Sequence, residues 1–159
     1  MTFIFMANTY SQISIQAVFA VKGRENIITK EWRDELHRYI SGIIQTEAKS
    51  LAVGGWQDHV HIFFGLPPAL SVSQLLQKVK ANSSKWINDK KFIKGKFQWQ
   101  EGYGAFSYSR SQRNAVINYI MKQEEHHKKK SFKEEYLEML NNFEIEHEEK
   151  YLFEFYGDI

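Results

Sequence analysis

The sequence has no cysteine, only two prolines and no long apolar run. Without cysteine there is no disulfide, thiol nucleophile or thiolate-bound metal, so a metal site has to use histidine, carboxylate, amide or water ligands. No apolar segment approaches the roughly 20 residues that span a bilayer, and no signal-peptide pattern opens the chain. We therefore expect a cytoplasmic protein without membrane contact. No linker interrupts the chain, which predicts a single domain over residues 1–159.

The net charge of +2 conceals two segments of opposite charge. Residues 141–159 hold six acids and one lysine and form an acidic C-terminal segment. Residues 78–96 hold seven lysines and one acid, Asp89, a composition that suits a polyanion such as nucleic acid. A merely solvated helix face would have the same composition, so charge alone leaves both interpretations open. Met6 directly precedes Ala-Asn-Thr-Tyr, and residues 1–5 are expected to be an extension from an upstream start.

Hydrophobic periodicity predicts an α+β fold. Strands are expected within residues 10–21, 51–53, 59–66 and 97–108, and helices are expected after caps at Thr29, Ser71, Ser111 and Ser131. The third of these helices runs to about His126. This order gives a ferredoxin-like β-α-β-β-α-β plan with an added C-terminal helix. The expected sheet is four-stranded and antiparallel, with helices against one face. That fold hosts many functions, so the site has to decide among them.

Two histidines, His59 and His61, alternate with Val60 on the third predicted strand. Side chains two residues apart leave the same face of a strand about 7 Å apart, so both imidazoles can converge on one cation. The apolar residues Val60, Ile62 and Phe64 occupy the opposite face and supply the core. We expect the histidine face to be exposed or to line a cleft. A metal or catalytic site is favoured, although strand histidines can also simply cap a sheet.

Tyr119 and Gln123 lie four residues apart on the third predicted helix and therefore share a face. A phenol with a pKa near 10 needs help to lose its proton before it can act as a nucleophile, and a glutamine carbonyl is a hard oxygen donor suited to Mg²⁺ or Mn²⁺. Helix spacing alone favours a half-buried structural role for Tyr119. Asp58 is interpreted as a turn residue or as a carboxylate that orients an imidazole. His126 and His127 are expected at a solvated helix end.

The motif His59-Val-His61 followed by an apolar strand, with Tyr119-Ile-Met-Lys-Gln123 further along, resembles the HUH single-tyrosine transposases. These are the short single-domain enzymes of single-strand insertion sequences. The flanking segments 17–24, 102–107, 123–127 and 131–136 also look like that family, and the resemblance extends from about Tyr10 to Glu149. The histidine triplet alone is a weak signal, but its order with the Tyr-x-x-x-Gln helix makes it specific.

The resemblance implies a function and assigns site residues. The family binds hairpin ends of mobile elements as single-stranded DNA and cuts with the tyrosine, leaving a 5′-phosphotyrosine link and a free 3′-hydroxyl. By position, Tyr119 would be the nucleophile, and His59, His61 and Gln123 would hold a divalent metal, Mg²⁺ or Mn²⁺. The resemblance also implies a homodimer in which the tyrosine helix docks on the histidines of the partner, so that the two subunits share their active sites.

The residues that contact DNA are less specified by the sequence. Lys78, Lys80 and Lys85 are expected to meet phosphates. Tyr103 and Phe106, in a glycine-flanked loop, can stack on unpaired bases or belong to the core.

The sequence lacks the motifs that several other functions would require. A histidine-triad hydrolase would need a third alternating histidine, where the chain has Phe63, and a two-histidine phosphoesterase would need a second His-x-Ser/Thr copy. A ferredoxin-like RNA-binding module would carry aromatic motifs on its central strands. A relative retained by the host for hairpin binding remains an open alternative.

Overall fold

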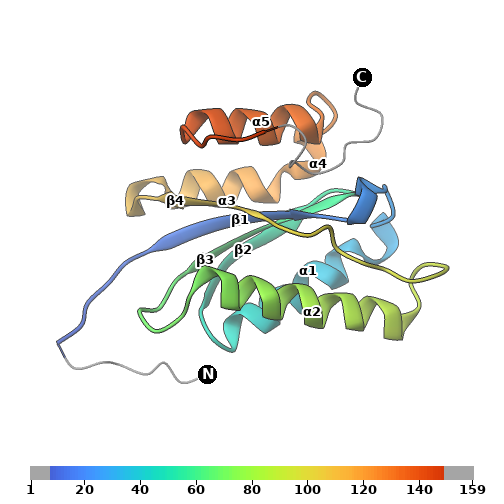
Figure 1. The fold of residues 1–159 in the computed structure, drawn as a ribbon, viewed down its shortest axis with the longest axis horizontal. Coiled ribbons are helices and arrows are strands. Elements are labelled where there is room, and N and C mark those ends of the chain that lie inside the picture. The colour runs from blue at the N-terminus through green and yellow to red at the C-terminus, as the bar shows by residue number, and fades with distance from the viewer. Residues whose placement is uncertain (1–7, 149–159) are drawn as a thin grey trace.

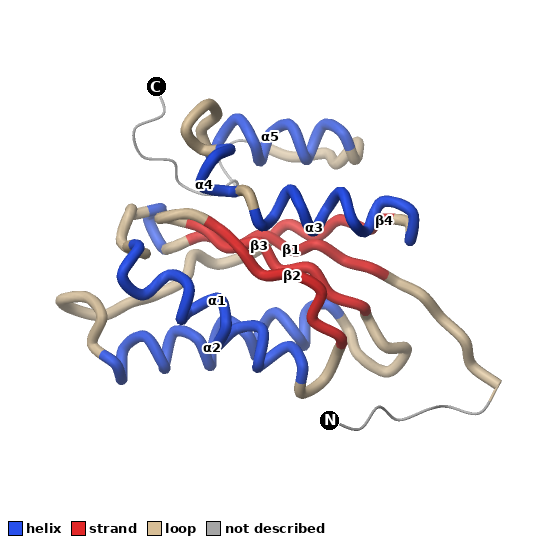
Figure 2. Tube along the Cα trace, turned by 180° about the vertical axis from the view of Figure 1, so that it is seen from behind, coloured by secondary structure: helices blue, strands red, loops and turns tan. Residues whose placement is uncertain are grey.

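The computed structural model describes residues 8–148 and contains a four-stranded antiparallel sheet with helices on both faces (Figures 1 and 2). The strand order is β2-β3-β1-β4. The strands are β1 (Ser14–Ala20), β2 (Lys49–Gly55), β3 (His59–Gly65) and β4 (Gly104–Tyr108). The α+β class and the antiparallel sheet are confirmed. The expected extension over residues 1–5, and residues 149–159 of the acidic segment, lie outside the described residues.

The helices form two layers, one on each side of the sheet. The first layer consists of α1 (Lys30–Gln45) and α2 (Val72–Lys90), and the second of α3 (Arg113–Met121), α4 (Gln123–His126) and α5 (Phe132–Asn142). Short 3₁₀ turns, η1 (Lys22–Arg24) and η2 (Arg110–Gln112), lie in the connections. No helix within residues 8–148 is long and apolar enough to cross a membrane.

The expectation that helices cover only one face of the sheet is wrong. All seven residues of β1 are buried, including Ser14 and Gln16, because the strand is covered from both sides. Alternate residues of β1 belong to different cores: Ile15, Ala17 and Phe19 pack with α1 and α2, whereas Val18 and Ala20 pack with α5. The second core exists because α5 carries its own apolar stripe, which is formed by Phe132, Tyr136, Met139 and Leu140.

Local sequence signals set the helix ends correctly in several places. Ser71 and Gln74 form the predicted capping box at the start of α2, and the Ser131 hydroxyl accepts a hydrogen bond from the Glu134 amide at the start of α5. Thr29 stands at the N-cap of α1 but makes no side-chain capping bond. The third predicted helix is interrupted at Lys122 (φ −107°, ψ 24°), so α3 and α4 are separate elements.

Two glycines let the second helical layer approach the sheet. A Cβ atom on Gly54 of β2 would lie 2.9 Å from Cγ2 of Ile120 and closer still to the Ile120 carbonyl oxygen. A Cβ on Gly104 of β4 would lie 2.7 Å from the hydroxyl of Tyr136. The absence of side chains at these positions therefore sets how deeply α3 and α5 dock onto the sheet.

Candidate active site

Strand β3 places His59 and His61 on the sheet face that α3, α4 and α5 cover. Val60, Ile62 and Phe64 fill the opposite core, as the alternation predicted. Both histidines are 0% exposed, so the expectation of an exposed or cleft-lining face is wrong. The reason is that Phe63 lies on the same face as the histidines and packs against Val116 and Ile120 of α3, which brings the helical layer over the whole strand.

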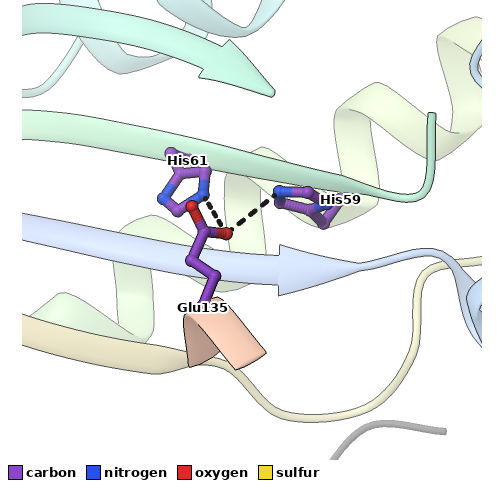
Figure 3. A group of neighbouring side chains, drawn as sticks. All are labelled: His59, His61 and Glu135. Carbon is purple, nitrogen blue, oxygen red and sulfur yellow. Dashed lines mark hydrogen bonds and ion pairs between the residues drawn. The ribbon is translucent and has the colours of Figure 1, made fainter. Parts of the chain in front are cut away.

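A carboxylate from α5, Glu135, lies between the two imidazoles (Figure 3). Its Oε1 atom is 3.2 Å from Nε2 of His61 and 3.4 Å from Nε2 of His59. Glu135 is itself 2% exposed and was not predicted from the sequence. Its sequence signal is its place on the apolar stripe of α5, between Phe132 and Tyr136, where an ionisable side chain has to find buried partners.

Tyr119 and Gln123 reach the same carboxylate from the other side. The Tyr119 hydroxyl donates a hydrogen bond to Oε2 of Glu135, and Nε2 of Gln123 donates to that same oxygen over 3.0 Å. Oε1 of Gln123 lies 3.1 Å from Nε2 of His59. The structure thus brings all four residues assigned by resemblance to one point, within a single chain and around Glu135.

Both strand histidines are fixed by a hydrogen bond at Nδ1, which leaves Nε2 facing the cluster. Nδ1 of His59 lies 2.7 Å from Oδ1 of Asp58, and Nδ1 of His61 lies 2.9 Å from the side-chain amide of Gln16. Of the two interpretations of Asp58, the structure therefore supports the carboxylate that orients an imidazole. A carboxylate that accepts the Nδ1–H of a ligating imidazole holds the ring in position, as Asp58 can for His59.

The prediction that His126 and His127 lie at a solvated helix end is wrong for His127. Its side chain is only 3% exposed, and Nε2 is 2.9 Å from Oε1 of Gln123 and 3.4 Å from Oε1 of Glu135. His126 is more open, with Nε2 3.7 Å from Oε2 of Glu135. The short helix α4 causes this arrangement, because the chain turns back there and α5 returns over the sheet.

The buried charges of the cluster shift its pKa values in opposite directions. Burial alone would lower the pKa of His59, but hydrogen bonds to Asp58 and Glu135 and the charges of both carboxylates raise it to about 9. Burial lowers the pKa of His61. Burial would raise the pKa of Glu135, but the surrounding imidazoles hold it well below its usual range. These shifts favour the charged forms of both Glu135 and His59.

The environment of Tyr119 keeps its hydroxyl protonated. Burial raises the pKa of Tyr119, and the negative charge and hydrogen bond of Glu135 raise it further. A cation placed among these groups would oppose both effects.

His59, His61 and Glu135 can hold a metal ion. One ligand atom from each lies within 4.8 Å of the other two. Two ligands that are each about 2.1 Å from one ion lie roughly 3.0–3.4 Å apart in octahedral or tetrahedral geometry, and the two Glu135–imidazole distances match that spacing. The donor set of two nitrogens and one oxygen suits a divalent ion.

A cavity of about 290 Å³ opens beside the cluster. Its lining includes Tyr119, His126 and Glu135 together with Gln16 and Tyr108. Tyr119 thus lines a space that a ligand can enter while its hydroxyl donates to Glu135.

The residues predicted to contact DNA differ in their exposure and in their partners. Phe106 is only 2% exposed and packs under α5, which agrees with the alternative that it belongs to the core, whereas Tyr103 is 37% exposed. The Lys80 ammonium donates to the backbone oxygens of Gln100 (2.7 Å) and Gly102 (2.9 Å) and so holds their loop. Lys78 pairs with Glu47 at 3.0 Å and Lys85 with Asp89 at 2.8 Å, both on the surface.

Comparison with known proteins connects this geometry to one family. The family model described as "Transposase IS200 like" matches residues 9–123. Among solved structures, a candidate transposase from Deinococcus radiodurans R1 is 19% identical with a TM-score of 0.61, over 76% of this chain and 98% of that one. A REP-associated tyrosine transposase bound to a REP hairpin is 13% identical with a TM-score of 0.52, over 74% of this chain and 70% of that one. A search of curated protein sequences finds no match.

Proposed function

Because the chain belongs to the IS200-like transposase family, we propose that it cuts and rejoins single-stranded DNA at hairpin-bearing ends of an insertion sequence. The intermediate is a covalent 5′-phosphotyrosine on Tyr119. The main support for this proposal is that the Tyr119 hydroxyl donates a hydrogen bond to the Glu135 carboxylate, which also contacts both His59 and His61. A nucleophile and a pair of metal-ligating side chains therefore converge on one point.

The proposed chemistry is a pair of phosphoryl transfers. The Tyr119 oxygen attacks the scissile phosphorus and forms a Tyr–O–P bond, while the bond to the 3′ oxygen breaks. Tyr119 gives up one proton and the departing 3′ oxygen gains one, which leaves a free 3′-hydroxyl. Attack by another 3′-hydroxyl reverses these bonds and joins new strands. The covalent link conserves the phosphodiester, so no ATP is required.

His59 and His61, with Gln123 as the third ligand assigned by resemblance, would hold Mg²⁺ or Mn²⁺. When bound, the ion supplies a Lewis acid that polarises the scissile phosphate. The residues themselves do the positioning, since Asp58 and Gln16 fix the imidazole planes and α3 carries Tyr119 to them.

A second, larger groove supports a single-stranded substrate. It has a volume of about 970 Å³, and its lining includes Lys22, Lys80, Lys96 and Trp99. Val21 is one of its lining residues, and the Val21 amide donates to the backbone oxygen of Asp58 over 2.9 Å, so the groove adjoins the strand end that carries His59. Lysines along a groove suit a phosphate backbone. The REP-associated tyrosine transposase is bound to a REP hairpin, and we propose hairpin binding for this chain as well.

We also propose that the protein works as a homodimer. The exchange of tyrosine helices implied by family resemblance would place Tyr119 and Gln123 of one subunit on the histidines of the other. In the single chain, α3 packs on its own β2 and β3, so exchange would substitute an equivalent contact from the partner.

The test is a search for the covalent adduct. Wild-type protein incubated with hairpin-bearing single strands and Mg²⁺ should form a protein–DNA adduct visible on a denaturing gel. Tyr119→Phe should bind the same DNA but form no adduct, while the control Tyr103→Phe should retain it. Hairpin binding by the wild type without any adduct would identify a binding protein instead, and an adduct on the Tyr119→Phe protein would place the nucleophile elsewhere.

A further inference from the structure

We propose that Glu135 is the third metal ligand of this site, with Gln123 as the residue that positions it. The inference rests on the proposed function and revises its ligand set, because resemblance assigns the third ligand to Gln123. Glu135 lies on α5, beyond the segment that the family model matches. It is therefore a property of this chain that the motif-based assignment does not contain.

The first argument is the position of the carboxylate. Oε1 of Glu135 is within 3.2–3.4 Å of Nε2 on both strand histidines, which is the separation expected for ligands of one ion. Oε1 of Gln123 instead makes hydrogen bonds to His59 and His127, and none to His61 among the described residues. Figure 3 shows the carboxylate aimed between the two rings.

The second argument is charge. Glu135 is a carboxylate at 2% exposure, and a buried anion needs a cation beside it. The amide of Gln123 brings no charge to a divalent ion, whereas a carboxylate neutralises half of it and is the harder donor that Mg²⁺ and Mn²⁺ prefer.

The third argument is that the two carboxylate oxygens of Glu135 have different partners. Oε1 faces the histidines, while Oε2 accepts hydrogen bonds from Tyr119 and from Nε2 of Gln123. Glu135 can thus bind an ion through one oxygen and hold the nucleophile through the other. Gln123 fixes the rotation of the carboxylate, which is a positioning role.

The fourth argument is how firmly α5 is anchored. The ring of Phe132 stacks on that of His59, with centroids 4.0 Å apart and planes 8° apart. Tyr136, Met139 and Leu140 are buried on the same helix. The helix therefore holds Glu135 against the histidines by packing that does not depend on the carboxylate.

The experiment measures Mn²⁺ affinity by isothermal titration calorimetry, with protein that carries no polyhistidine tag and without DNA. Glu135→Gln, which keeps the shape and removes the charge, should lower the affinity by about a hundredfold. Gln123→Ala should lower it by about tenfold, the lower end of the range expected for a residue that only orients a ligand. The matched control is Glu138→Gln, an exposed acid one turn along α5 that pairs with Lys130, and its affinity should equal that of the wild type.

Three results would overturn the inference: wild-type affinity in Glu135→Gln, a larger loss in Gln123→Ala than in Glu135→Gln, or no Mn²⁺ binding by the wild type. Circular dichroism and thermal unfolding establish that each variant folds. Glu135→Asp, which retains the charge but shortens the side chain, should bind Mn²⁺ better than Glu135→Gln and gives a second comparison if Glu135→Gln unfolds. A wild type that binds Mn²⁺ through Glu135 but forms no DNA adduct would refute the proposed function and leave the ligand assignment standing.

Discussion

Replacing Gly54 with alanine should damage the site from a distance. Gly54 lies on β2, and its missing side chain is what allows the end of α3 to approach the sheet. A Cβ there would be 2.9 Å from Cγ2 and 3.1 Å from the carbonyl carbon of Ile120, and closer to the carbonyl oxygen. Backbone cannot rotate away as a flexible side chain can, so the last turn of α3 has to withdraw by about 1 Å to regain ordinary contact. Tyr119 precedes Ile120 and moves with it.

Gly54→Ala should reduce both the stability of the fold and the rate of DNA cleavage. Overpacking of this kind costs about 1–3 kcal/mol, which for a chain of this length lowers the melting temperature by roughly 2–12 °C. A displacement of about 1 Å at a nucleophile costs about a hundredfold in rate. The assays are thermal unfolding by circular dichroism and the rate of adduct formation with hairpin DNA.

The matched control is Gly42→Ala. Gly42 lies on the exposed side of α1, and a Cβ there meets nothing within 4 Å. Alanine should therefore stabilise the helix by about 0.5–1 kcal/mol and leave the rate of adduct formation unchanged. A Gly54→Ala protein with wild-type melting temperature and wild-type rate would show that α3 does not dock as described and would refute the reasoning.

Three further predictions concern charge, substrate and assembly. The pKa of His59 is about 9 in the folded protein and about 6.5 in the unfolded chain. The charged imidazole therefore stabilises the folded protein fully below pH 6.5, and this stabilisation is lost as the pH rises through 9. In denaturant unfolding of the metal-free protein, the free energy of unfolding should fall by up to about 3 kcal/mol between pH 7 and 9.5. Asp58→Asn should make this pH dependence weaker. A wild-type free energy of unfolding that does not depend on pH would contradict the ion pair. The affinity for a single-stranded hairpin should fall steeply as the salt concentration rises, and it should exceed the affinity for a blunt duplex. Equal affinity for both DNA forms would indicate that residues 78–96 are only a solvated helix face. In the exchanged dimer, mixing inactive Tyr119→Phe and His61→Ala proteins should restore cleavage, with the adduct on the His61→Ala chain only; no recovery after proven subunit exchange would mean that each chain uses the complete site it already contains.

The sequence predicted the strands and most helices because those features are local. The alternation around His59 and His61 placed both imidazoles on one face, and the capping residues located the starts of α2 and α5. The burial of that face was not predicted, although Phe63 on the histidine side was a signal that something packs there. Which helix covers a sheet face depends on contacts between segments far apart in the chain, which periodicity does not report.

The candidate site shows the same limit. Tyr119 and Gln123 could be proposed from a four-residue spacing and a family motif, even though the helix between them is broken at Lys122. Glu135 and His127 could not, because their roles arise only when the chain reverses after α4. The one usable signal was an acid on the apolar stripe of α5. The sequence left both roles open for Phe106, because a glycine-flanked aromatic is equally typical of a loop and of a strand under a helix.

The alternation along β3 has a consequence for how the strand can change over evolutionary time. Its odd-numbered residues belong to the site layer and its even-numbered ones, Val60, Ile62 and Phe64, to the opposite core. A substitution in β3 therefore damages one side and spares the other. Insertion or deletion of a single residue would shift the frame of the strand, carrying the imidazoles into the apolar core and valine or isoleucine into the site. The strand should consequently accept conservative replacements at its even-numbered positions but no change of length, so length variation in relatives should be confined to the loops on either side of it.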